Sequence, residues 1–258
     1  MSWKLEAAVG CHMGRVRDNN EDNLFFNGRV LELIHPGLRH AQKYEFELED
    51  KDLCFCVFDG MGGEEAGEVA SYVAAKTLQR ELAGHQDVLL SPRERLFRIC
   101  ESMNLAVCGE SDRRQNIRMG STFVLFYFLG DEVYVCNLGD SKAFRLRGEE
   151  WMQISEDHVE SLPPAFTRGK PRLTQHLGIR PDELQLVPYL AKGRIEAGDQ
   201  YLLCSDGLTD MVSKEEICRI LQSSPDAREC VENLIATAND RGGKDNISII
   251  LIRIPEES

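Results

Sequence analysis

Acidic residues stand at one end of four apolar, strand-like segments of this chain. LCFCVF leads into Asp59-Gly60 and YLLCS into Asp206-Gly207, while Asp245 precedes NISIILIRI and the pair Glu21-Asp22 precedes NLFF. A run of this kind that ends at a charge is typical of a buried strand. Strands that lie side by side can bring their ends together at one edge of a sheet, so we expect these carboxylates to converge.

Carboxylates gathered at that density need a counter-charge, because neighbouring like charges cannot all stay ionised. A pair of divalent cations supplies it, and oxygen-only ligation suits magnesium or manganese better than zinc. Two such ions can activate a water as a nucleophile for phosphoester hydrolysis. Arg17, at the start of the acidic turn, offers a fork of donors for a phosphate. Each motif alone also fits a plain turn or a surface ion pair, so the prediction rests on their combination.

The elements that must position these residues follow from apolar periodicity. Helices are predicted at 65–83, 92–107, 214–222 and 226–239. Strands are predicted at 5–11, 44–48, 121–129, 132–138, 142–147, 183–191, 201–205 and 246–254. Tight-turn sequences at Gly130-Asp131 and Leu138-Gly139-Asp140 indicate an antiparallel meander, and Gly139-Asp140-Ser141 is interpreted as structural. Residues 29–52 are interpreted as a hairpin insertion without a chemical role.

Composition limits the partners and the compartment. The chain has 258 residues and a formal charge of −13, which argues against duplex nucleic acid and is explained most simply by solubility. Its nine cysteines form no CxxC pair and several lie in strand-like runs, which indicates buried reduced thiols. No apolar run approaches ~18 residues and the N-terminus lacks a signal-peptide pattern, so we expect a cytoplasmic protein without membrane contact.

With these residues collected, the chain resembles the metal-dependent protein phosphatase family (PPM, type 2C), in its bacterial serine/threonine branch. The matching stretches occur in family order and span nearly the whole chain. They are GRVRDNNEDN (14–23), VFDGMGGEEAGEVAS (57–71), MGSTFVLF (119–126), LGDSKAFRLR (138–147), LLCSDGLTDMVS (202–213) and GGKDNISIILI (242–252).

The resemblance implies an α+β fold: a four-layer α-β-β-α sandwich of two antiparallel sheets flanked by helices, formed by residues 1–258 as a single domain. It implies two Mn or Mg ions, with Asp59 bridging both and the Gly60 carbonyl holding one. Asp206 and Asp245 would complete the other, while Glu21 and Asp22 would lie on the second metal's side. Arg17 would bind the substrate phosphate.

This chain departs from the family pattern in the loop after Asp59. Met61 and Glu64 stand where many family members carry histidine. If such a histidine protonates the leaving oxygen, another acid must replace it here. His158 and His12 are substitutes in principle, although each is interpreted first as a structural histidine.

Two further departures concern the flap and a third metal. Residues 158–178 are shorter than the family's usual flap and carry Arg168, Lys170 and Arg172, for which a solvated loop is the favoured interpretation. Some family members bind a third, weaker metal through an aspartate before the MGST-like stretch. Asp112 is the nearby candidate here, and we do not predict that site.

The function predicted is serine/threonine protein phosphatase activity through water activated by a dinuclear metal site. The partners expected are phosphorylated proteins, substrates of a serine/threonine kinase, and the chain is expected to act as a monomer. Two alternatives remain open: a non-catalytic phosphoprotein-binding module on the same fold, and a metal-dependent phosphoesterase that acts on small molecules.

Overall fold

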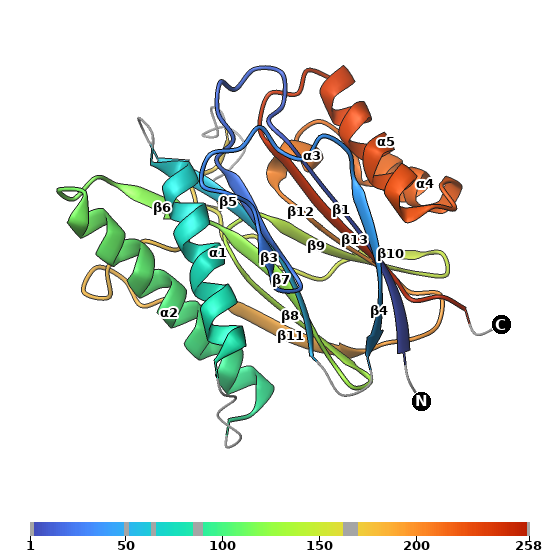
Figure 1. Cartoon of the computed structure of the whole chain (residues 1–258), viewed down its shortest axis with the longest axis horizontal. Helices are drawn as coiled ribbons and strands as arrows, with labels where there is room; N and C mark the ends of the chain where they lie inside the picture. Colours follow the sequence, from blue (N-terminus) through green and yellow to red (C-terminus); the bar gives the residue numbers. More distant parts are fainter. Residues whose placement is uncertain (1–2, 49–51, 63–65, 85–89, 162–169, 257–258) are drawn as a thin grey trace.

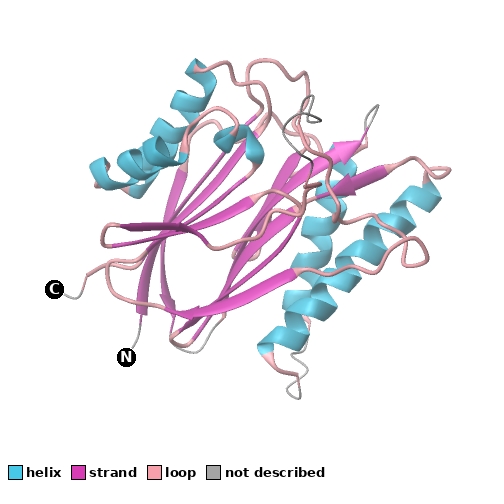
Figure 2. Cartoon of the chain, turned by 180° about the vertical axis from the view of Figure 1, so that it is seen from behind, coloured by secondary structure: helices cyan, strands magenta, loops and turns pink. Residues whose placement is uncertain are grey.

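Two antiparallel sheets lie face to face in the computed structural model, with helices on both outer sides (Figures 1 and 2). The structure describes residues 3–48, 52–62, 66–84, 90–161 and 170–256. The two facing sheets and their outer helices confirm the predicted α-β-β-α sandwich. No helix among these residues is long and apolar enough to cross a membrane.

The first sheet has six strands and the second has seven. In spatial order the first sheet contains β10 (Glu150–Gln153), β9 (Lys142–Arg147), β12 (Gln200–Cys204), β13 (Ile247–Arg253), β1 (Trp3–His12) and β4 (Gln42–Leu48). The second contains β11 (Tyr189–Arg194), β8 (Glu132–Leu138), β7 (Phe123–Leu129), β5 (Leu53–Gly62), β2 (Asp22–Phe26) and β3 (Arg29–Val30), while β6 (Met119–Ser121) pairs with the far end of β5.

The helices cover the two outer faces in pairs. The second sheet is covered by α1 (Gly67–Ala83) and α2 (Pro92–Arg113), and the first by α4 (Lys214–Ser223) and α5 (Ala227–Asp240), with the short α3 (Asp206–Thr209) beside β13. Ser91 opens α2 with a capping box, because its hydroxyl accepts from Glu94 N while its own N–H donates to the Glu94 carboxylate.

Alternating burial on the strands builds three apolar layers. On β5, Leu53, Phe55 and Val57 face the space between the sheets, whereas Cys54, Cys56 and Phe58 face α1 and α2. Successive side chains point to opposite faces of the strand. Because both faces of β5 are covered, every residue from 53 to 58 is apolar. β13 repeats the pattern between the inter-sheet layer and α5.

The predicted thiol burial is confirmed. Eight of the nine cysteines are buried and none forms a disulfide among the residues described. Desolvation raises the pKa of Cys11 to about 12, which keeps this thiol protonated and unreactive at neutral pH.

The predicted meander is wrong at its second turn. β7 and β8 pair as a hairpin, but β9 pairs with β10 and β12 in the opposite sheet. The segment Gly139-Asp140-Ser141 is therefore a crossover between sheets, and Gly139 adopts a φ of 105° there. Local sequence specifies a change of direction, whereas the choice of sheet depends on which strand edge is open.

Two other boundaries differ from the prediction. The strand expected at 183–191 starts only at Tyr189. The N–H groups of Glu183 and Leu184 donate to Arg180 O in a turn, and Pro188 has no N–H to give to a ladder. The region 29–52 supplies β3 and β4, edge strands of the two sheets, and β4 pairs with β1 over seven residues. Its status as an insertion stays a prediction.

Candidate active site

Two strands of the second sheet bring Asp22 and Asp59 together. In the antiparallel pair of β2 and β5, Asp22 lies directly opposite Asp59. The Asp22 side chain is almost completely buried, with 1% of its surface exposed. The backbone can follow this path only with glycine at position 60, because a Cβ there would lie 2.1 Å from Gly67 O. Glycine is thus required by the close approach of β5 to the start of α1.

The first sheet supplies Asp206 from the opposite side. β12 ends at Cys204, Ser205 precedes α3, and Asp206 is its first residue. The Ser205 hydroxyl donates to Asp22 Oδ2 at 2.8 Å, which links the two sheets at this end of the sandwich. The acids therefore converge from two facing sheets, not along one sheet edge as expected.

Asp245 and Arg17 form the rim of the same site. Arg17 Nη2 donates to Asp245 Oδ2 at 2.8 Å, and 45% of the Arg17 side chain is exposed. The nearby acids, with Asp245 foremost, raise the pKa of Arg17 further, so it stays charged. Its guanidinium has donors left over for an incoming anion.

Asn246 holds the acidic turn in place, a role the sequence analysis missed. Its side-chain NH₂ donates to Met13 O at 2.8 Å and to Asn19 O at 2.9 Å, and its Oδ1 accepts from Glu21 N at 2.8 Å. Asn246 is buried, with 3% exposed. The signal in the sequence is the position of Asn246 between Asp245 and the apolar run ISIILIRI, because an amide where burial begins needs hydrogen-bond partners.

The electrostatics show that the carboxylates act on one another. Burial, followed by the charges of Asp22, Asp140 and Asp245, raises the pKa of Asp59 well above its usual range. Burial is also the main cause that raises the pKa of Asp22 to about 7. Glu21 is half-buried and its pKa is raised, again mainly by desolvation.

This donor set fits hard divalent cations. It consists of carboxylate and carbonyl oxygens, and Asp206 Oδ1 is buried without a hydrogen-bond partner among the residues described. Within the described ranges, no three His, Cys, Asp or Glu side chains already surround one point closely enough to hold an ion. We call this group of neighbouring acids, Asp22, Asp59, Asp206 and Asp245, the acidic chamber; a bound cation would have to draw their side chains inward.

Lys170 supplies a counter-charge at this site, and its side chain is 47% exposed, as expected for a residue of a solvated loop. Its ammonium contacts the Asp206 carboxylate and lies 3.7 Å from Asp140 Oδ2 and 3.6 Å from Asp210 Oδ2. Asp140, interpreted as a purely structural turn residue, is 7% exposed and acts electrostatically on Asp59. Arg172 is exposed, and Arg168 lies outside the described residues.

His12 and His158, the possible replacements for the family's histidine, both use Nδ1 for backbone contacts. Gly14 N donates to His12 Nδ1 at 2.9 Å, and Gly139 N donates to His158 Nδ1 at 3.2 Å. Burial lowers the pKa of His12. These contacts support the structural interpretation of both residues.

The remaining positions singled out in the sequence lie elsewhere. Met61 pairs with Gly120 across β5 and β6, and Glu64 falls outside the described residues. Asp112 lies in the last turn of α2, where it forms an ion pair with Arg180.

The chain shows extensive similarity to known phosphatases. A family model described as "Protein phosphatase 2C" matches residues 39–251. The serine/threonine phosphatase stp of Listeria innocua is 31% identical over 96% of this chain and 95% of its own length. The solved structure of the S. agalactiae serine/threonine phosphatase superposes with a TM-score of 0.80 at 25% identity, over 97% of this chain and 99% of that chain.

A second solved structure bears on the chemistry of the site. The catalytic domain of the serine/threonine protein phosphatase PstP, in complex with two manganese ions, is 27% identical, with a TM-score of 0.75 over 99% of this chain and 100% of that chain. These matches agree with the motifs, the sandwich and the acidic chamber, and the chain belongs to the protein phosphatase 2C family.

Proposed function

We propose that this chain hydrolyses phosphoserine and phosphothreonine in proteins at the chamber formed by Asp22, Asp59, Asp206 and Asp245. The observation that carries the proposal is their convergence. The paired strands place Asp22 opposite Asp59, Ser205 ties Asp22 to the strand that leads into Asp206, and Asp245 acts electrostatically on both Asp22 and Asp59.

The chamber has the composition of a dinuclear metal site. Asp59 and the Gly60 carbonyl, with Asp206, Asp245, Glu21 and Asp22, would hold two Mn or Mg ions. Bound there, the ions supply neutralising charge and an activated water for in-line attack on phosphorus. The manganese pair in the PstP structure supports this assignment.

In this proposal Arg17 binds and orients the substrate phosphate. It reaches the rim from the turn that Asn246 holds, and Asp245 fixes one edge of its guanidinium. The remaining donors can form a bidentate contact with two phosphate oxygens, which adds orientation as well as charge. A residue fixed in this way reduces the entropy cost of aligning the substrate.

The cellular setting follows from the same class of chemistry. A serine/threonine phosphatase opposes a serine/threonine kinase, so the expected substrates are that kinase's phosphorylated targets. Buried, unpaired thiols support a reducing cytoplasm, and we retain the monomer as the working state.

The decisive experiment measures phosphate release from a phosphothreonine peptide and from para-nitrophenyl phosphate. We expect turnover with added MnCl₂ and none in EDTA. Asp59→Asn and Asp206→Asn should each lose at least about 100-fold in kcat/KM, because each substitution removes a charged ligand. The exposed Asp182→Asn is the matched control and should retain full activity.

The same assay separates the alternatives. Full activity in either site variant would contradict the assignment of the metal site. Manganese binding by calorimetry without turnover on any phosphopeptide would indicate a binding module. Faster hydrolysis of nucleotides or sugar phosphates than of phosphopeptides would indicate a small-molecule phosphoesterase.

A further inference from the structure

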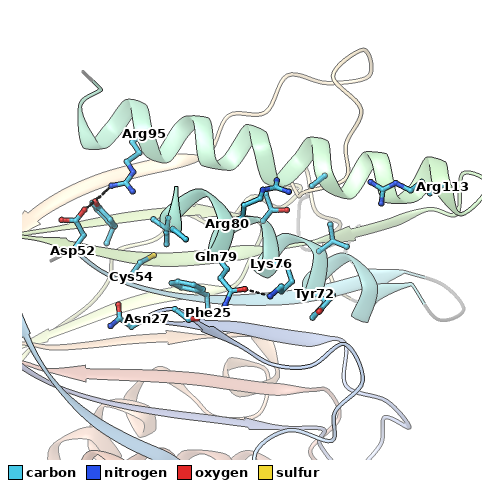
Figure 3. Close-up of a pocket in the computed structure, with 17 residues that line it drawn as sticks. Phe25, Asn27, Asp52, Cys54, Tyr72, Lys76, Gln79, Arg80, Arg95 and Arg113 are labelled. Atoms are coloured by element: carbon cyan, nitrogen blue, oxygen red, sulfur yellow. Dashed lines mark hydrogen bonds and ion pairs between the residues drawn. The ribbon is translucent and has the colours of Figure 1, made fainter. Parts of the chain in front are cut away.

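A large pocket lies away from the acidic chamber, between α1, α2 and the second sheet (Figure 3). Its volume is about 980 Å³, at the upper end of the range of small-molecule sites. Phe25 of β2 and Cys54 of β5 line it on the sheet side. Asp22 and Asp59 lie on the same two strands, roughly 10 and 17 Å farther along the backbone. A ligand in this pocket would therefore leave the acidic chamber free.

The pocket has an apolar lining. Phe25, Cys54 and Tyr127 are each at most 3% exposed and belong to the layer under the helices. Val73 and Leu82 of α1 also line the cavity. A surface of this kind favours a ligand with an apolar or aromatic body.

Basic residues outnumber acids around this lining. Lys76, Arg80, Arg95 and Arg113 line the pocket together with a single carboxylate, Asp52. This excess of positive charge occurs on a chain with a formal charge of −13. It is therefore a local feature, and it favours an anionic ligand.

One end of the pocket is already neutralised. Arg95 Nη1 lies 3.2 Å from Asp52 Oδ2 and donates to the Tyr127 hydroxyl at 2.7 Å, and its side chain is only 15% exposed. In Figure 3 this group stands at one end of the pocket and Arg113 at the other, with Arg80 and Lys76 between them. The least compensated charge thus lies in the middle, at Lys76 and Arg80.

Among the residues that the structure describes, Lys76 and Arg80 of α1 have only weak or neutral partners. Lys76 donates to the neutral Gln79, and Gln79 in turn donates to Gly28 O at 2.8 Å. Arg80 has a distant carboxylate, Glu81 Oε1 at 3.8 Å, and its side chain is 71% exposed. Lys76 and Arg80 are four residues apart, so they stand on the same face of the helix. Arg113 is held by Glu110 at its side.

We propose that this pocket binds a small polyanion with an apolar or aromatic body, of the chemical class of nucleoside di- and triphosphates. Lys76 and Arg80 would bind its phosphates, with Arg113 adding charge, and the apolar lining would receive the organic part. The proposal does not depend on the phosphatase reaction, because the pocket and the acidic chamber share no residue.

The test uses isothermal titration calorimetry in EDTA with ATP, pyrophosphate and adenosine as probes. The Asp59→Asn protein is used so that neither metal nor turnover contributes. We expect ATP to bind more tightly than pyrophosphate or adenosine alone, because it can use both halves of the site. Lys76→Glu with Arg80→Glu should weaken ATP binding at least about tenfold.

A matched control makes the same change of charge on the opposite side of the molecule. Arg219→Glu with Arg228→Glu, on α4 and α5, should leave ATP binding unchanged. The milder pair Lys76→Gln with Arg80→Gln gives a second test if charge reversal unfolds α1, which circular dichroism would show. Equal binding by the α1 variants and wild type, or no binding of ATP by wild type at millimolar concentration, would overturn the proposal.

Discussion

The sequence pattern of an apolar run followed by Asp-Gly occurs twice in this chain, with two different structural outcomes. At Asp59-Gly60 the strand continues, because β5 extends to Gly62 and pairs with β6. At Asp206-Gly207 the strand has already ended at Cys204, and the aspartate opens α3. Both aspartates nevertheless reach the same chamber.

The two sites also balance their charge differently. Desolvation, followed by the neighbouring carboxylates, raises the pKa of Asp59, and Lys170 opposes this only weakly. Asp206 instead contacts the ammonium of Lys170. One local motif can therefore serve either as an acid repelled by its neighbours or as half of an ion pair, depending on which distant segments face it.

The largest effect is expected from filling the two glycines. Gly60→Ala would place a Cβ 2.1 Å from Gly67 O, and Gly207→Ala would place one 2.0 Å from Asn246 O. Since both obstacles are backbone atoms, each variant should lose about 3 kcal/mol or more of stability and nearly all activity. Urea unfolding and phosphate release measure the two effects.

Gly193→Ala serves as the control for these variants, because nothing lies within 4 Å of the added Cβ. It should unfold at nearly the wild-type urea concentration. If Gly60 tolerates alanine while Gly207 does not, the backbone of β5 can move aside more easily than the start of α3. The two glycines would then not be equally constrained.

The second prediction concerns the sign of a stability change without metal. In EDTA at pH 8, Asp59→Asn should be more stable than wild type by about 1 kcal/mol, because the amide removes a charge that its neighbours repel. Asp206→Asn should show no such gain, because it loses its contact with Lys170. Urea titrations of the two variants and wild type give the comparison.

The pH dependence of stability tests whether charge repulsion causes the gain expected for Asp59→Asn. The folded-state pKa of Asp59 is raised above its ordinary 3.8, so its stabilising contribution is present at low pH and is lost as the pH rises. The advantage of Asp59→Asn over wild type should therefore shrink when the pH falls from 8 to 5. An advantage that does not change with pH would show that charge repulsion is not its source.

The smallest effect is expected at Lys170. Lys170→Ala removes a cation that competes with metal for Asp206, so the manganese concentration for half-maximal activity should fall about two- to fivefold. The exposed Arg172→Ala changes the same charge nearby and should have less effect. A higher manganese requirement in Lys170→Ala would show instead that this lysine assists the site.

The elements with a regular burial pattern could be predicted from the residues alone. β5 and β13 have covered faces on both sides, and α4 and α5 have one apolar face, so each shows its period directly in the residues. The acids at the strand ends were visible for the same reason, because a charge that follows an apolar run marks where burial stops.

Which distant segments meet could be learned only from the folded chain. That β9 joins the opposite sheet, that Lys170 enters the chamber and that Asn246 fastens the turn carrying Arg17 all depend on contacts between residues far apart in the chain. Local periodicity reports only whether a face is buried. It carries no information about which segment buries it, and in this protein that choice sets the charge balance of the site.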